Sequence, residues 1–377
     1  MTPARDANSR RDAVVLGTSF LAALVIRVLF LLWQQDHNNL LFWRIVVGVL
    51  KRGGDLYGNA DYYRYNYSPL WAGLLWILAR VAPAAGLSLN QAVSLFLTAV
   101  DAATAVLLFR IALQRTGSRR RSLAVSLLFF ANPVSAIVSG TLGAFDNLAI
   151  FFLLIAVGNA RRVPVSRPAT VAAMSLSLLA KHVAWFHPLL FARPGEKPRR
   201  ALLAVLSPYA LFCLSFLPFW LSRNAIWTNV FGYRALDEPY GLEFLRSWTF
   251  LPGWTQQAIF LTTALVAVAA LRRVEFGRAC LLLFLVTLIF LPGIVQNYFV
   301  WPIALGALYS SAGYAVYSVI VALFLIHSPD ALALELPHLP GWSGPWWAAV
   351  FWLLWEIRKM RRADTAAAAR ISANPIA

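Results

Sequence analysis

Polar and ionisable residues interrupt a mostly apolar sequence at four widely separated places. Asp36 follows the first apolar run, and the pair Asp146–Asn147 opens a later one. Lys181 and His182 interrupt a third apolar stretch, and the pair Gln296–Asn297 interrupts a fourth, shortly before Trp301. A charge at the centre of a membrane costs roughly 2.5–3.5 kcal/mol, so such residues usually mark a function. If the four places share one depth, they predict a polar site embedded in a membrane.

Each of these places also has a purely structural interpretation. Asp146 and Asn147 are residue types that cap helix N-termini, and Lys181 can extend its ammonium to a membrane interface. Asp36 can be a solvated loop acid, and the tyrosines around Tyr65 can form an interfacial aromatic belt. The five histidines have no His-x-x-x-His spacing, and no glycine-rich phosphate loop or Ser–His–Asp pattern stands out.

The composition identifies the class of protein that must position these residues. Of the 377 residues, 60% are hydrophobic and only 13% are charged, and the mean hydropathy is +0.65. One soluble core could not bury that much apolar surface, so we expect an all-α polytopic membrane protein. The net charge of +17 then reflects the excess of Lys and Arg in cytoplasmic loops rather than a nucleic-acid partner. The two cysteines lie in apolar runs and predict neither a disulfide framework nor a thiolate metal site.

The basic clusters set the predicted orientation. They lie near residues 5–11, 115–121, 161–167, 193–200, 272–278 and 358–362. All of them are cytoplasmic if residues 13–33 form a retained first span and residues 34–90 form one large, helical outer loop. Within that loop, the short run 69–85 is then a re-entrant or interfacial helix that does not cross.

About twelve transmembrane helices follow from this count, with both termini inside. After the first span, the predicted helices are residues 91–113, 122–139, 146–160, 168–180, 182–191, 201–221, 252–271, 277–291, 297–309, 312–327 and 345–357. Residues 1–362 form a single transmembrane domain, and residues 363–377 are expected to be a disordered cytoplasmic tail.

The order of the motifs resembles the GT-C superfamily of integral-membrane glycosyltransferases. An acid past the first span is followed by Tyr65-Asn66-Tyr67-Ser68-Pro69-Leu70-Trp71, Asn132-Pro133, Gly143-Ala144-Phe145-Asp146-Asn147, Lys181 and Gln296-Asn297-Tyr298-Phe299-Val300-Trp301-Pro302. The likeness covers residues 16–308 and is greatest to bacterial polyprenol-phosphate-mannose-dependent mannosyltransferases and their eukaryotic dolichyl-phosphate-glucose counterparts. It implies inverting transfer of a sugar from a polyprenyl-monophosphate carrier, at the periplasmic side of the bacterial inner membrane.

The resemblance also implies roles for individual residues. Asp36 matches the general base that takes the proton of an acceptor hydroxyl. Lys181 is the first candidate for the cation that stabilises the leaving phosphate, with Arg234 and Arg246 in reserve. The expected substrate-binding residues are His37, Tyr65, Asn66, Asp146, Asn147, Lys181, His182, Arg234, Arg246, Gln296, Asn297 and Trp301.

One departure from the family's pattern concerns metal. In the oligosaccharyltransferase catalytic subunit, a second acid two positions after the first helps to hold a divalent ion, and here that position is Leu148. We therefore expect no metal and no cofactor besides the polyprenyl-phosphate-sugar donor, although the pair Asp237–Glu238 in a later outer loop could supply metal ligands. The partners are membrane lipids, that lipid-linked donor, and an acceptor glycolipid, glycan or protein.

Two other classes of function remain open. A transporter or flippase of a lipid-linked or polar substrate would also use buried polar residues and short helices, although no inverted repeat is visible. A non-catalytic scaffold that binds prenyl lipid is the third reading. Asp36 discriminates among them, because only the enzyme needs a base at a fixed position beside a phosphate site.

Overall fold

The computed structural model describes residues 14–15, 17–29, 38–58, 65–160, 165, 167–233, 253–328 and 343–373, and all of its regular elements there are helices. A first helix spans Gly17–Leu29. The further α-helices are α2 (Asn38–Lys51), α3 (Pro69–Val81), α4 (Leu89–Thr116), α5 (Arg119–Phe130), α6 (Pro133–Ala136), α7 (Asp146–Asn159), α8 (Pro168–Ala180), α9 (Pro198–Leu214), α10 (Arg223–Ile226), α11 (Gly253–Leu271), α12 (Phe276–Phe290), α13 (Ile303–Tyr309), α14 (Ala312–His327) and α16 (Gly344–Ala373).

Short helices of other types join or extend these elements. The 3-10 helices are η1 (Pro83–Ala85), η3 (His182–Ala184), η4 (His187–Phe191), η5 (Leu217–Ser222) and η8 (Gln296–Val300). Two π-helical turns, η2 (Ile137–Thr141) and η6 (Trp227–Phe231), extend α6 and α10. Such turns are rare and are frequently found at functional sites.

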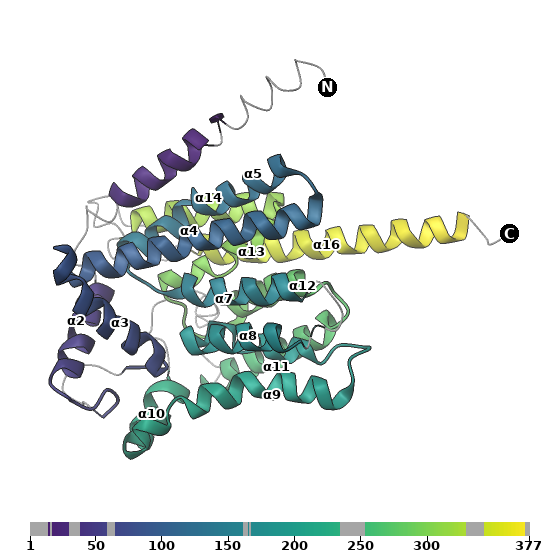
Figure 1. The fold of residues 1–377 in the computed structure, drawn as a ribbon. Coiled ribbons are helices and arrows are strands. Elements are labelled where there is room, and N and C mark those ends of the chain that lie inside the picture. The colour runs from purple at the N-terminus through teal and green to yellow at the C-terminus, as the bar shows by residue number, and fades with distance from the viewer. Residues whose placement is uncertain are drawn as a thin grey trace.

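The long helices lie side by side in one bundle (Figure 1). At one end, Arg115 of α4 pairs with Glu275 just before α12 (2.7 Å), and Arg193 Nε donates to the carbonyl of Arg272 (2.9 Å). At the other end lie α2, α3 and α10. The predicted basic clusters around Arg115, Arg193 and Arg272 are therefore neighbours in space, as a shared cytoplasmic side requires.

Two helices of the described chain are long and apolar enough to cross a membrane. They are α4 and residues Trp254–Leu271 of α11, and two bent helix pairs raise the number to four if each pair counts as one span. The pairs are α5 with Pro133–Thr141, bent by 48°, and α9 with Leu217–Phe231, bent by 66°. The other apolar helices are shorter, so length and composition do not confirm the predicted twelve spans.

Several predicted helix boundaries are confirmed. Helices α8 and α14 have the predicted bounds. Pro168 in the first turn of α8 explains where that helix begins. Ser311 caps the start of α14 by accepting a hydrogen bond from Tyr314 N (3.3 Å). The run predicted as a non-crossing helix consists of α3 and η1, with Ser68 as its N-cap.

Four predicted helices need correction. Residues 122–139 are divided among α5, α6 and η2, with a bend of 48° at the break before Pro133. Residues 182–191 form η3 and η4 rather than one α-helix, because Pro188 lacks an amide donor and disfavours helical geometry at His187. Residues 297–309 are likewise divided at Pro302 into η8 and α13. Beyond residue 214, the helix predicted over 201–221 becomes η5, where Pro218 lies in the first turn.

The C-terminal boundary also differs from the prediction. Helix α16 extends to Ala373, past the point after residue 362 where a disordered tail was expected. Four consecutive alanines, Ala366–Ala369, supply the highest intrinsic helix propensity, which accounts for the continuation. Figure 1 shows this end of α16 projecting beyond the bundle.

Candidate functional site

Asp146 is the centre of a buried hydrogen-bond cluster at the bundle end that carries α2 and α3. Its side chain is fully buried, and Lys181 Nζ donates to its Oδ2 atom at 2.7 Å. Asn297 Nδ2 donates to the same oxygen (2.8 Å), and Trp301 Nε1 donates to Oδ1 (2.7 Å). Two segments that are distant in sequence, around Lys181 and around Asn297, thus converge on the Asp146 carboxylate. Three of the four polar places that the sequence singled out therefore meet, and the fourth, Asp36, lies outside the described residues.

The chain before Asp146 is held by helix α2. Trp43 Nε1 donates to the carbonyl of Gly143 (2.9 Å), and Asn39 Nδ2 donates to the carbonyl of Leu142 (3.0 Å). Gly143 has a φ of +57°, and a Cβ there would lie 2.4 Å from Leu40 Cδ2. This position therefore needs glycine, both for its left-handed backbone and for the close approach of α2.

Lys181 lies where α8 ends, and aromatic rings surround its ammonium. The residue has extended backbone angles (φ −158°, ψ 134°) that stop the helix after Ala180. Its Nζ lies 5.0 Å from the ring centroid of Phe145, 5.3 Å from that of Tyr67 and 5.6 Å from that of Tyr298. Ring faces attract a cation, so the ammonium is stabilised by Asp146 and by three rings together.

A cavity of about 540 Å³ opens beside this cluster. Lys181, His182, Asn66 and Trp301 form its polar wall, together with Gln256 and Gln257. The apolar part of the wall includes Phe212 of α9, Val230 and Phe231 of η6, Phe260 of α11, and Leu291 and Pro292 directly after α12. The cavity thus combines a lysine and several polar side chains with an apolar and aromatic surface, an arrangement that suits an amphipathic anion.

Predicted site residues within the described chain divide into two groups. Asn66, Asp146, Lys181, His182, Asn297 and Trp301 line the cavity or hydrogen-bond to one another. Tyr65 and Gln296 are buried elsewhere: the Tyr65 hydroxyl donates to Ser68 O (3.0 Å), and Gln296 Nε2 donates to Ser328 Oγ (2.6 Å). Asn147 turns away from Asp146 and toward α4. Asp36, His37, Arg234 and Arg246 lie outside the described residues.

Sequence reasoning missed a second buried ion pair. Arg27 of the first helix and Asp101 of α4 are 1% and 0% exposed, and Arg27 Nη1 lies 2.5 Å from Asp101 Oδ2. Asn147 Nδ2 donates to the other oxygen of Asp101 (2.7 Å). Both ionisable residues lie inside runs that we interpreted as apolar spans. Their charges were a usable signal, because a charged residue within a membrane span is costly unless it has a partner, and each could therefore have been expected to pair.

Other missed residues were next to predicted ones. Tyr67 and Tyr298 face Lys181 and belong to the quoted motifs, although only their neighbours were expected to bind substrate. Gln256 and Gln257 line the cavity from the first turns of α11. Like Lys181, they interrupt an apolar run, and that signal could have identified them.

Asp55 is a further carboxylate near the end of the bundle that carries α2. Burial raises the pKa of this carboxyl, but hydrogen bonds from Ser222 and from the backbone N–H groups of Tyr57 and Gly58 outweigh burial and bring the pKa below its usual value. The Ser222 contact joins the segment after α2 to η5. A carboxylate with a lowered pKa is a weak general base, so Asp55 is suited to a structural role.

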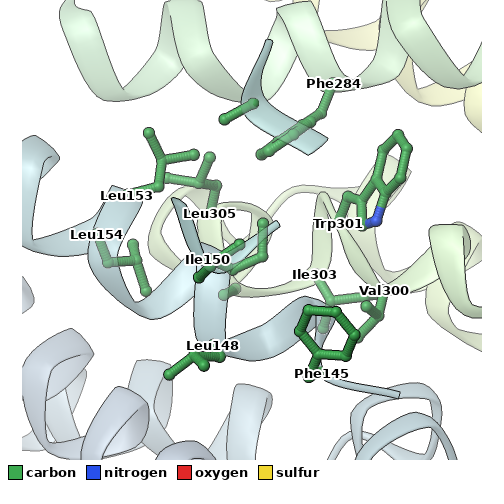
Figure 2. Packing of buried hydrophobic residues seen from close by; sticks show 14 of the residues in the cluster. Phe145, Leu148, Ile150, Leu153, Leu154, Phe284, Val300, Trp301, Ile303 and Leu305 are labelled. Carbon is green, nitrogen blue, oxygen red and sulfur yellow. The ribbon is translucent and has the colours of Figure 1, made fainter. Parts of the chain in front are cut away.

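No metal ion was expected, because Leu148 occupies the position at which the oligosaccharyltransferase subunit has a metal-binding acid. Leu148 is buried with Ile150 of α7 and Ile303 of α13 in one apolar cluster, part of which Figure 2 shows. Among the described residues, no three His, Cys, Asp or Glu side chains gather where a metal ion could be held.

Comparisons with known proteins add no name to this geometry. No protein-family model, no curated protein and no solved structure matches the chain.

Proposed function

We propose that this chain is a membrane glycosyltransferase that moves a sugar from a polyprenyl-monophosphate carrier to an acceptor hydroxyl. The observation that carries the proposal is that Lys181, whose ammonium pairs with Asp146, lines a cavity in which aromatic and apolar side chains are numerous. A phosphate has the charge to pair with that ammonium, and a prenyl chain suits the apolar wall between α9 and α11.

The ion pair with Asp146 is compatible with this role. The hydrogen bond from Lys181 to Asp146 uses one of the three N–H donors of the ammonium. Asn297 and Trp301 also donate to the carboxylate, so Asp146 keeps partners while Lys181 contacts a phosphate. The pair thus stores a cation in the bundle without leaving a buried charge unpaired.

In the proposed reaction the acceptor oxygen attacks the anomeric carbon of the donor. The new C–O bond forms as the bond from that carbon to the phosphate oxygen breaks, and the configuration inverts. The hydroxyl proton goes to the base, and the bonding electrons leave with the lipid phosphate, whose charge Lys181 stabilises. Phosphate is a sufficiently good leaving group that no second carboxylic acid is required.

We assign the base to Asp36, with Arg234 and Arg246 as further candidates for phosphate contacts. Helix α2 begins two residues after Asp36 in the sequence, and its first turns are hydrogen-bonded to the segment directly before Asp146. This attachment supports a function for the Asp36 segment at the same site.

The proposed setting is the bacterial inner membrane, with the cavity on the periplasmic side. The basic residues near Arg115, Arg193 and Arg272 gather at the opposite end of the bundle from α2 and α3. That segregation supports the predicted orientation and about twelve passes, several of them made by short or broken helices.

The test is a transfer assay with the purified protein in lipid nanodiscs. The protein is incubated with a bacterial lipid extract as acceptor and, in separate reactions, with the radiolabelled mannose, glucose or galactose derivative of polyprenyl phosphate as donor. The proposal predicts that label moves into a new product and that Asp36→Asn lowers the rate by about two to four orders of magnitude. Normal transfer by Asp36→Asn would exclude Asp36 as the base.

The same donors distinguish the alternative functions. In sealed vesicles, a flippase would move intact donor between leaflets, and a scaffold would retain donor without altering it. Either result, with no transfer of any of the three sugars, contradicts the proposal.

A further inference from the structure

Two buried ion pairs lie on opposite sides of the first turn of α7. Asp146 faces Lys181 and the cavity, and the next residue, Asn147, faces Asp101 and Arg27. No charged member of either pair is more than 4% exposed. Because Asp146 and Asn147 are consecutive residues, one peptide unit of α7 connects the Asp146–Lys181 pair to the side chain that contacts the Arg27–Asp101 pair.

The second pair holds Asn147 in one orientation. Its Nδ2 donates to Asp101 Oδ1 (2.7 Å) and lies 2.9 Å from Ser139 Oγ and 3.1 Å from Ser135 Oγ. A flipped amide would point its oxygen at the Asp101 carboxylate, which is electrostatically unfavourable. The amide is thus fixed by acceptors on α4, on α6 and on η2.

Arg27 fixes Asp101 in turn. Its Nε donates to the carbonyl of Phe130 (2.8 Å), its Nη2 donates to Ser135 Oγ (3.1 Å), and its guanidinium carbon lies 4.7 Å from the centre of the Phe130 ring. The pair therefore joins the first helix, α4 and the end of α5, and connects them to α7 through Asn147.

We propose that the Arg27–Asp101 pair is a positioning element that acts through Asn147 to hold the Asp146 carboxylate, and with it the Lys181 ammonium, at the cavity wall. Neither Arg27 nor Asp101 lines the cavity. The inference rests on the proposed function in treating Lys181 as the phosphate contact, but the placement of the ammonium can be measured without turnover.

The measurement is NMR of protein labelled with 13Cε-lysine. The chain has only four lysines, Lys51, Lys181, Lys197 and Lys359, so Lys→Arg variants assign every signal. Rings of Phe145, Tyr67 and Tyr298 surround Lys181 Nζ, and their ring currents give the Lys181 signal a position distinct from those of the other lysines. A change in ammonium placement therefore shifts one assigned resonance.

Three variants remove the positioning element or a matched interaction. Arg27→Met combined with Asp101→Leu replaces the ion pair by apolar side chains of similar size, which avoids an unpaired buried charge. Asn147→Leu leaves the ion pair intact and removes the connection to α7. Thr104→Val is the control, because Thr104 is fully buried on the same helix and its hydroxyl donates to Val100 O of its own turn (2.8 Å), with no other hydrogen bond to the described residues.

We expect the double variant and Asn147→Leu each to move the Lys181 resonance toward the exposed lysines. Binding of farnesyl phosphate should weaken about 2- to 30-fold, the range seen for residues that act through others. Thr104→Val should change neither quantity.

An unshifted Lys181 resonance in either folded variant would overturn the inference, as would an equal shift in Thr104→Val. If the resonance shifts as expected but farnesyl phosphate fails to bind the wild type, the positioning role stands and the proposed function fails. The two claims are therefore separable.

Discussion

At the residue scale, the proposed phosphate site requires that Lys181 contact an anion other than Asp146. Lys181→Ala should weaken binding of farnesyl phosphate about 10- to 150-fold, because a hydrogen bond to a charged group contributes about 1.5–3 kcal/mol. Lys197→Ala, at an exposed lysine just before α9, is the control and should leave binding unchanged. Titration of the labelled lipid into nanodiscs measures both.

A structural ion pair would give a different result. If the affinity for farnesyl phosphate is unchanged in Lys181→Ala while the added change Asp146→Asn restores the lost thermal stability, then Lys181 serves only to neutralise Asp146. The proposed phosphate site would then have to move to Arg234 or Arg246.

Glu275 allows a prediction for pH. Burial raises the pKa of this carboxyl, but Arg115, the Tyr309 hydroxyl and the N–H groups of Arg278 and Gly277 outweigh burial and hold the pKa below its usual value of 4.5. Because the folded pKa is the lower one, the stabilisation is complete above pH 4.5 and is lost as the pH falls through the folded value.

We therefore expect wild type to have a higher Tm than Glu275→Gln at neutral pH. That difference should shrink as the pH falls below 4.5, where wild-type Glu275 also becomes neutral. Thermal unfolding in detergent across this range measures it. A difference that is independent of pH would show that the charge of Glu275 does not stabilise the fold.

At the element scale, the attachment of α2 to the segment before Asp146 is the feature that joins α2 to the site. Gly143→Ala should destabilise the protein, because a left-handed alanine costs about 1–2 kcal/mol and overpacking against Leu40 costs about 1–3 kcal/mol more. Gly73→Ala is the matched control, since nothing lies within 4 Å of a Cβ at Gly73.

Thermal unfolding compares the two glycine variants. Helical Gly73→Ala should be neutral or slightly stabilising. Equal stability of Gly143→Ala and wild type would show that α2 does not hold this segment in the way the hydrogen bonds from Trp43 and Asn39 indicate.

The predictability of the elements follows from local signals. The first residues of helices α8 and α14 could be predicted, because a proline in the first turn of α8 and a serine before α14 are typical of helix N-termini. The stretch 182–191 was misjudged because apolar character alone does not distinguish an α-helix from consecutive 3-10 turns. Its backbone is tolerated because His187 and Leu190 are buried within the bundle.

The candidate site was predictable in part. Lys181 and Asp146 were identifiable because an ionisable residue in an apolar run is conspicuous. The contacts made by Asn297 and Trp301 with Asp146 depend on how distant segments pack, and no local pattern encodes the direction of a side chain. For the same reason, nothing in the sequence separated Asn147, which faces Asp101, from its neighbour Asp146.

At the scale of the whole molecule, the two ends of the bundle should lie on opposite sides of the membrane. Exposed apolar side chains on α9 and α11, such as Leu203 and Val266, form the kind of surface that lipid covers. In a background with Cys213→Ser and Cys280→Ala, Ala84→Cys should react with an impermeant maleimide from outside the cell. Arg119→Cys should react only after permeabilisation.

Both test positions are exposed, and they lie at opposite ends of α4 in η1 and at the start of α5. Labelling of Arg119→Cys in intact cells would show that the orientation in the membrane is the reverse of the predicted one. The cavity beside Lys181 would then face the cytoplasm, where the proposed periplasmic transfer could not take place.

The central claim is that the cavity holds a lipid phosphate at Lys181. The most direct measurement is a cryo-electron microscopy map of the protein in nanodiscs with farnesyl phosphate bound. We predict phosphate density within hydrogen-bond distance of Lys181 Nζ, about 2.7–3.2 Å, and prenyl density along Phe212, Phe231 and Phe260 of the cavity wall. A phosphate bound elsewhere, with Lys181 in contact with Asp146 alone and the cavity without lipid, would contradict the account.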